Sequence, residues 1–258
     1  MSKELVKSGK SFLSSEEEMK DLTGLTVAAG NEEHLSQDEL EMPFLRLGQK
    51  MTKVEIDDLK PGMFFNTVSE EVYGETLVIQ VHGYFHNYTK WMGPKGNGEF
   101  RGSMTTSEFR EFEKTASPAL AKEGGDMVHT VEGEALRYTD THNFLVSLPE
   151  YPEEGLMLYP LSSTGCKVAK KWNTLNNGRK INGQQAKRYA TIWELTTGSF
   201  ESNGFSYKQV KSLKSLGTPS KELLAFGEEC SIFAQSVKEQ GVKYSDEHTT
   251  TAADESEY

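Results

Sequence analysis

Cysteine is scarce in this chain of 258 residues, which contains only Cys166 and Cys230. Two isolated thiols provide neither a disulfide framework nor the paired-cysteine spacing of a structural zinc site. The composition therefore predicts a protein of a reducing compartment, with two ordinary thiols and no metal held by cysteine.

Long hydrophobic runs are absent as well. No apolar stretch approaches the roughly 20 residues that a membrane-spanning helix needs. Near the start of the chain, Glu16, Glu17 and Glu18 stand where a secretory signal would carry its apolar core. We expect a cytoplasmic protein that has no membrane partner.

Motifs of catalysis are also missing. The sequence has no phosphate-binding GxxxxGK[ST] loop, no GxSxG nucleophile turn and no HExxH zinc motif. The glycines from Gly93 to Gly98 resemble a phosphate loop but lack its Lys-Ser/Thr end, so they predict a hairpin loop, in which Lys95 and Arg101 contact a nucleic-acid backbone. The expectation is a protein that is not an enzyme and that needs no cofactor.

Charge is present in excess and is unevenly distributed. The formal net charge is −11, and residues 1–42 hold ten acidic side chains against four basic ones. Residues 161–215 reverse this balance, with ten Lys/Arg against Glu194 and Glu201. A basic block inside an acidic chain predicts a polyanionic partner more strongly than the overall charge argues against one.

The hydrophobic pattern predicts a mainly β protein with helices (α+β): a five-stranded barrel with insertions and a C-terminal helix. We expect an acidic, largely disordered arm over residues 1–41 with a short helix around 15–23, a core over 42–241, and a flexible acidic tail over 242–258. Strands are predicted at 42–47, 63–68, 76–91, 127–131, 135–148, 156–161, 186–197 and 205–214. Helices are predicted at 105–114, 119–123, from the Ser162–Thr164 cap to Leu175, and from Thr218 to about Gly241, the last burying Leu223, Leu224, Phe226, Ile232, Phe233 and Val237.

The strand over residues 76–91 carries the first candidate binding surface. Strict alternation places Leu77, Ile79, Val81 and Phe85 on one face and Gln80, His82, Tyr84, His86 and Tyr88 on the other, followed by Lys90 and Trp91. Exposed aromatic rings among hydrogen-bond donors stack bases without selecting a sequence, although packing of the tyrosines under a loop is an equal alternative. His82 and His86 are separated by roughly 13 Å along a strand, too far to share one metal ion.

The basic block supplies the second candidate surface. Lys167, Lys170 and Lys171 share one side of a predicted helix, in which Trp172 is expected to face the core. The other candidate residues are Arg179, Lys180, Lys187, Arg188, Tyr189, Lys208, Lys211 and Lys214. Cations interleaved with aromatic side chains predict a groove for a single-stranded nucleic acid, although a solvated charged face remains the alternative.

The chain ends in a third feature, an acidic run closed by an aromatic residue. Asp254, Glu255 and Glu257 precede Tyr258 and the terminal carboxylate. Such a segment imitates phosphates with a stacked base, so it can compete for the basic groove and recruit partner proteins. A purely solvating tail is the alternative.

Several short segments, in this order, resemble single-stranded-DNA-binding proteins of tailed bacteriophages. They cover residues 43–49, 60–66, 88–91, 162–172, 193–197 and 201–207. The resemblance implies an OB-fold that coats single-stranded DNA during phage replication, recombination and repair, with possible self-association. The ending is similar to the tips by which replication single-strand-binding proteins recruit a polymerase or helicase-primase, except that Tyr258 stands in place of Phe. Some relatives carry a cysteine-rich metal site, for which this sequence has no residues.

Two rival functions remain open from the sequence. A recombination annealing protein would bind the same strands but form rings. A virion or replisome scaffold would bind proteins through its acidic termini and show no preference for single-stranded DNA.

Overall fold

The computed structural model describes residues 42–50, 56–93, 98–116, 120–123, 126–131, 133–202 and 204–240. The expected N-terminal arm, the acidic tail and Lys95 lie outside the described residues. Within the described part of the chain, no helix combines the length and apolar character needed to cross a membrane.

The centre of the fold is a pair of long antiparallel strands, β4 (Thr76–Met92) and β8 (Glu134–Ser147). They belong to an eight-stranded sheet of order β13-β12-β4-β8-β7-β6, in which β5 also pairs with β4 and β9 with β8. The other strands of this sheet are β5 (Glu99–Thr105), β6 (Leu120–Glu123), β7 (Asp126–Val131), β9 (Leu156–Ser162), β12 (Ile192–Ser202) and β13 (Phe205–Gly217). β1 (Leu45–Leu47), β2 (Phe64–Asn66) and β3 (Val72–Gly74) form a second sheet, and β10 (Lys180–Ile181) and β11 (Gln184–Gln185) form a hairpin.

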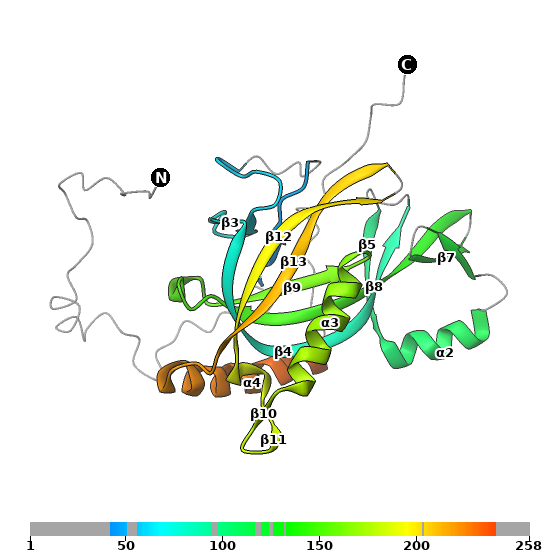
Figure 1. Cartoon of the computed structure of the whole chain (residues 1–258). Coiled ribbons are helices and arrows are strands. Elements are labelled where there is room, and N and C mark those ends of the chain that lie inside the picture. Colours follow the sequence, from blue (N-terminus) through cyan, green and yellow to red (C-terminus); the bar gives the residue numbers. More distant parts are fainter. Residues whose placement is uncertain are drawn as a thin grey trace, which may run out of the picture. The chain divides into compact units, whose positions relative to one another are not determined.

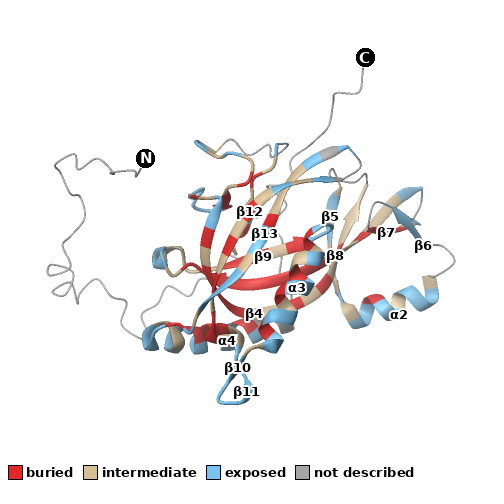
Figure 2. Ribbon diagram, in the orientation of Figure 1, coloured by how far each residue is buried: buried red, intermediate tan, exposed pale blue. Residues whose placement is uncertain are grey.

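The large sheet curls into a half-barrel around an apolar core (Figure 1). The core gathers side chains of β4, β8, β9, β12 and β13, and the buried stretches of these strands are red in Figure 2. Helix α3 (Gly165–Gly178) covers one side, and its Trp172 is fully buried, with its ring stacked 4.4 Å from that of Phe144. The expected burial of Trp172 is confirmed.

Polar contacts join the two ends of the curl. Leu158 N donates to Pro43 O at 2.8 Å, which connects the segment before β1 to β9. At the other end, the Gln49 side chain makes two hydrogen bonds with the backbone of Lys208. Gln49 Nε2 donates to the Lys208 carbonyl (2.8 Å), and Gln49 Oε1 accepts from the Lys208 N–H (2.9 Å). A backbone hydrogen bond at one end and the Gln49 side chain at the other therefore replace part of a continuous strand ladder.

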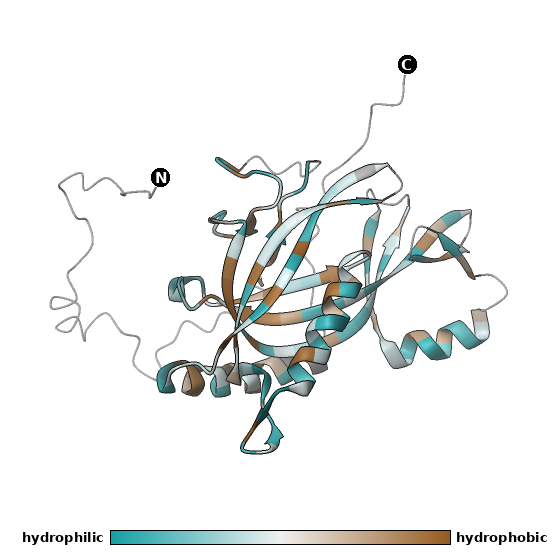
Figure 3. Cartoon of the chain, viewed as in Figure 1, coloured by the Kyte–Doolittle hydropathy of each residue, from teal (hydrophilic) through white to brown (hydrophobic). Residues whose placement is uncertain are grey.

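The described residues establish a mostly β, α+β protein with three α-helices, and the expected class and C-terminal helix are confirmed. The closed five-stranded barrel is not found, because the large sheet is an open half-barrel of more strands. Buried and partly buried residues alternate along β12 from Ile192 to Gly198, as expected for a strand with one face toward a core, and the hydropathy of β12 and β13 is mixed along their length (Figure 3).

Beyond the barrel, the outer halves of β4 and β8 extend into an arm with β5, β6, β7 and α2 (Thr106–Ala116). The residues at 120–123 are strong helix formers, but they pair with β7 as a strand, and the predicted helix at 119–123 is wrong. Phe109 of α2 is buried and stacks on Tyr88 at 3.8 Å.

A β-bulge in the middle of β4 overturns the predicted division of its faces. Val81 pairs with Val146 and Gly83 with Leu145, so His82 is an extra residue in the ladder. The insertion exchanges the faces beyond it: Tyr84 packs against the same core as Val81, whereas Phe85 belongs to a second cluster with Leu145. Gln80 and His82 are both buried, whereas Tyr84, His86 and Tyr88 are half-buried, so the five residues do not form one surface.

Helix α4 (Lys221–Gln240) packs against β4 through small residues. Gly227, Cys230 and Ala234 are its buried positions, whereas Phe226, Ile232 and Phe233 remain 39%, 67% and 39% exposed. The predicted buried side is therefore wrong for these three large residues, because close approach to β4 leaves no room for them. Val237 lies among the residues whose side chains are not described.

Two local elements differ from the predicted ones. Arg188–Ala190 forms a 3-10 turn, η4, ahead of β12, where a strand was predicted from residue 186. The Gly/Asn-rich segment over residues 176–185, where no regular element was predicted, contains the β10/β11 hairpin. Helix α3 begins after Thr164 as expected, but Thr164 makes no side-chain capping bond.

Candidate nucleic-acid interface and histidine–aspartate cluster

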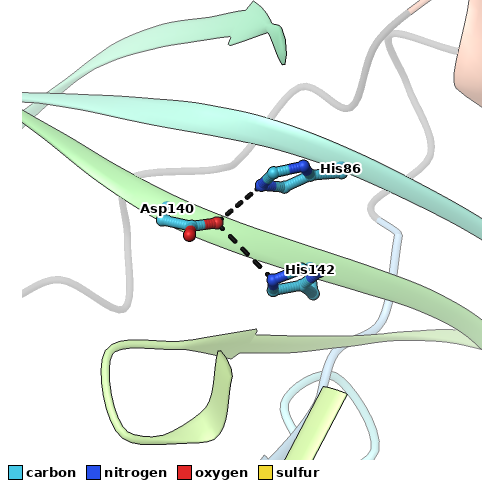
Figure 4. Close-up of side chains that lie close together, drawn as sticks. All are labelled: His86, Asp140 and His142. Carbon is cyan, nitrogen blue, oxygen red and sulfur yellow. Dashed lines mark hydrogen bonds and ion pairs between the residues drawn. The ribbon is translucent and has the colours of Figure 1, made fainter. Parts of the chain in front are cut away.

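The candidate site lies at the middle of β4 and β8, where the barrel passes into the arm. His86 of β4 and His142 of β8 are direct cross-strand partners. Asp140 precedes His142 by two residues on β8 and therefore points to the same side of the sheet. The three side chains converge, with both imidazole rings directed at the carboxylate (Figure 4).

The distances within this histidine–aspartate cluster are short. His86 Nε2 is 2.6 Å from Asp140 Oδ1, and His142 Nε2 is 3.6 Å from the same oxygen. The two imidazole rings are stacked in parallel, with centroids 4.5 Å apart and planes 3° apart. Among the described residues, this is the one group of three side chains whose possible ligand atoms all lie within 4.8 Å of one another.

The outer nitrogen of each histidine also has a partner. Thr106 Oγ1, at the start of α2, is 3.1 Å from His86 Nδ1, and Tyr84 Oη is 2.7 Å from His142 Nδ1. These contacts fix the orientation of both rings and leave both Nε2 atoms directed at Asp140.

Burial differs among the three members. The His142 side chain is 5% exposed, compared with 26% for His86 and 31% for Asp140. Burial lowers the pKa of His142, and the hydrogen bond with His86 lowers the pKa of Asp140. The cluster is therefore open to solvent on the side of Asp140 and His86 and closed behind His142.

Two cations predicted from the sequence lie beside this cluster. The guanidinium carbon of Arg188 is 4.8 Å from the centroid of the Tyr84 ring, and Arg188 Nη1 donates to Asn173 Oδ1 at 2.9 Å. The Lys170 ammonium also lowers the pKa of Asp140, which places its charge near the carboxylate. Lys167, Lys170 and Lys171 are all exposed on α3.

The structure thus brings Tyr84, His86, Tyr88, Lys170 and Arg188 together from three separate segments. The tyrosines are half-buried: Tyr84 under Arg188, and Tyr88 against Phe109. Farther along the arm, Lys90 is half-buried and Trp91 packs edge-to-face on Phe100.

Other predicted cations are occupied elsewhere. Lys187 pairs with Glu228 at 3.0 Å, Lys214 with Glu194 at 3.6 Å and Lys208 with Glu75 at 3.8 Å. Glu75 and Glu228 from outside the basic block, and Glu194 within it, therefore neutralise part of its charge. Of the remaining candidates, Arg101 pairs with Glu99, Arg179 bonds Ser215 and Thr218, Lys180 and Lys211 are exposed, and Tyr189 is buried.

Asp140 and His142 are the site residues that sequence reasoning missed. Their spacing, with one residue between them in a predicted strand, places both side chains on one face. Their approach to His86 depends on the register of β4 against β8, which the sequence pattern does not specify.

A family model described as "Pam3 phage gp34-like protein" matches residues 14–243, and the chain belongs to this family. No curated protein matches the sequence, and no solved structure matches the fold.

Proposed function

We propose that this member of a phage protein family binds single-stranded DNA without sequence preference, through the surface formed by the middle of β4, helix α3 and turn η4. The binding residues are Tyr84, His86, Tyr88, Lys170 and Arg188, with Lys167 and Lys171 extending the basic surface along α3. The protein coats and protects single strands during phage replication, recombination or repair.

The observation that supports this proposal most directly is the position of Arg188 and Lys170. Both come from the basic block: Arg188 lies over the ring of Tyr84 on β4, and Lys170 lies near Asp140 on β8, the strand paired with β4. Arginine over a tyrosine face and lysine beside a polar sheet combine a cationic track with rings on which bases stack.

The chemistry follows from these groups. Lysines and arginines that contact phosphates release condensed counterions, so binding weakens as salt increases. Each base stacked on an aromatic side chain adds roughly 1–3 kcal/mol, with little regard to base identity. Tyr84 and Tyr88 are half-buried, so the edges of their rings and the adjoining histidines provide the contact.

We further propose that the half-barrel is an open variant of the OB-fold. Its support is the curled sheet around one core, with β1 joined to β9 at one end and Gln49 bonded to β13 at the other. Such an open barrel presents a sheet face to single strands.

Salt titration of poly(dT) binding tests the proposed function. We expect the double variant Lys170→Glu, Lys171→Glu to bind poly(dT) more weakly. If both lysines neutralise phosphates, the slope of log K against log[salt] falls by about 1.4, because each phosphate contact on a single strand contributes about 0.7.

The matched control is Lys114→Glu with Lys122→Glu, which makes the same change of charge on the exposed arm. It should keep the wild-type slope. Equal affinity for duplex DNA would favour the scaffold function, an unchanged slope in the α3 variant would move the interface elsewhere, and ring formation on DNA in sedimentation would identify an annealing protein.

A further inference from the structure

We propose that His86, Asp140 and His142 form a binding site for one first-row divalent transition-metal ion, of which Zn²⁺ is the representative. The site uses Nε2 of both histidines and Oδ1 of the aspartate, and it leaves coordination positions open toward solvent. This inference does not depend on the proposed binding of DNA.

The contact between His86 and Asp140 is the first observation. His86 Nε2 lies 2.6 Å from Asp140 Oδ1, while Thr106 Oγ1 lies 3.1 Å from His86 Nδ1 on the other side of the ring. A proton on Nε2 holds the nitrogen and the carboxylate oxygen at this distance, and a metal ion bound by both atoms would replace that proton.

His142 supplies the second observation. Its side chain is 5% exposed, and its Nε2 atom has no hydrogen-bond partner while it points toward Asp140 Oδ1 at 3.6 Å. A buried nitrogen left unpaired costs free energy, and coordination of a metal ion removes that cost.

Binding of such an ion requires the ligand atoms to move apart and one ring to turn. Ligands bound tetrahedrally at about 2.0–2.1 Å lie about 3.4 Å apart, and the observed separations from Asp140 Oδ1, 2.6 and 3.6 Å, lie on either side of this value. The two imidazole rings are parallel, with centroids 4.5 Å apart, so their Nε2 lone pairs meet at one ion only after one ring rotates. His86 is the more exposed of the two histidines, and its ring is the one that can turn.

The donor set selects the class of metal. Two imidazoles with one carboxylate suit zinc, iron, nickel or cobalt, whereas Mg²⁺ and Ca²⁺ prefer oxygen ligands alone. Thr106 and Tyr84 bond the outer nitrogens, an arrangement that typically orients metal-bound histidines. The positive charge of Lys170 lies near Asp140 and therefore weakens the binding of a metal cation there.

Equilibrium dialysis of the untagged full chain against Zn²⁺ at neutral pH, followed by metal analysis, tests the site. We expect about one zinc per chain in the wild type and in His129→Ala, a control that removes a histidine from β7. His86→Ala and Asp140→Asn should each bind zinc more than about 100-fold more weakly, since loss of an outer hydrogen-bond partner alone costs roughly 10–100-fold.

Thermal melting shows whether each variant is folded and gives a second readout, because zinc should raise the melting temperature of the wild type but not of His86→Ala. Lys170→Met should tighten zinc binding. Equal zinc in the wild type and the ligand variants, no zinc in the wild type, or equal binding of Mg²⁺ would each overturn the proposal. The second of these results would mean that a proton alone bridges His86 and Asp140.

Discussion

Substitution of Gly83 by alanine is expected to destabilise the packing of α4 on β4. A Cβ atom at position 83 would lie 2.4 Å from the Cβ of Ala234, whereas carbon atoms pack best at about 3.5–4.0 Å. Helix and strand would have to separate by more than about 1 Å. Overpacking of a well-filled contact typically costs about 1–3 kcal/mol in free energy of unfolding.

The partner substitution Ala234→Gly provides the test of this mechanism. By itself it should cost about 1 kcal/mol in helix propensity and about 0.8 kcal/mol for the buried methyl group. In the double variant the clash is absent, because the next atoms to a Cβ at Gly83 are 3.6 Å or more away. The double variant should therefore be no less stable than Ala234→Gly alone.

Urea unfolding followed by tryptophan fluorescence measures all four proteins of this cycle. The expected coupling between the two positions is about 1–3 kcal/mol in favour of the double variant. If the two losses simply add, or if Gly83→Ala unfolds within about 0.5 kcal/mol of the wild type, the close approach of α4 to the bulge is not what stabilises this contact.

Three further predictions concern other parts of the chain. Gln80→Met should lower the free energy of unfolding by roughly 1–3 kcal/mol, because Gln80 Nε2 donates to the buried carbonyl of Tyr189 (2.8 Å) and to the partly buried carbonyl of Leu223 (2.9 Å); an unchanged urea midpoint would contradict this. Burial lowers the pKa of His82 to about 4, so the neutral His82 ring contributes fully to the free energy of unfolding above pH 6.5, and up to roughly 3 kcal/mol of that contribution should be lost as the pH falls toward 4. Urea midpoints of the wild type and of His82→Gln should converge over that pH range, and parallel curves would refute the assignment. Removal of Asp254–Tyr258 should tighten poly(dT) binding at low salt in a filter-binding assay, since the acidic tail then no longer competes, and equal or weaker binding would exclude that role.

The long elements of the fold were accessible from the sequence because their patterns are sustained. β4 was predicted at 76–91 and spans Thr76–Met92, and α2 differs from its prediction by one or two residues at its ends. The bulge at His82 was not accessible, since one extra residue in a ladder leaves composition and length unchanged. It nevertheless moves every later side chain of β4 to the other face.

The packing of α4 shows a second limit of sequence reasoning. The largest apolar residues were expected to face the core, but the contact uses Gly227, whose position would place a Cβ 2.8 Å from Tyr189 Cβ. Backbone proximity here outweighs the burial of large side chains. The candidate site has the same limit: the aromatic and basic residues could be named individually, whereas Asp140 and His142 join them only through cross-strand register.

Thr106 links the histidine–aspartate cluster to the arm. It is the first residue of α2. The preceding Thr105 donates its N–H to Glu108 Oε2 at 2.7 Å, and the Glu108 N–H donates to Thr105 Oγ1 at 3.2 Å. These two bonds fix the first turn of the helix. A rotation of the His86 ring therefore has to move the start of α2 or break its bond to Thr106. Loss of the Thr106 hydroxyl would therefore release the His86 ring and the first turn of this 11-residue helix from each other.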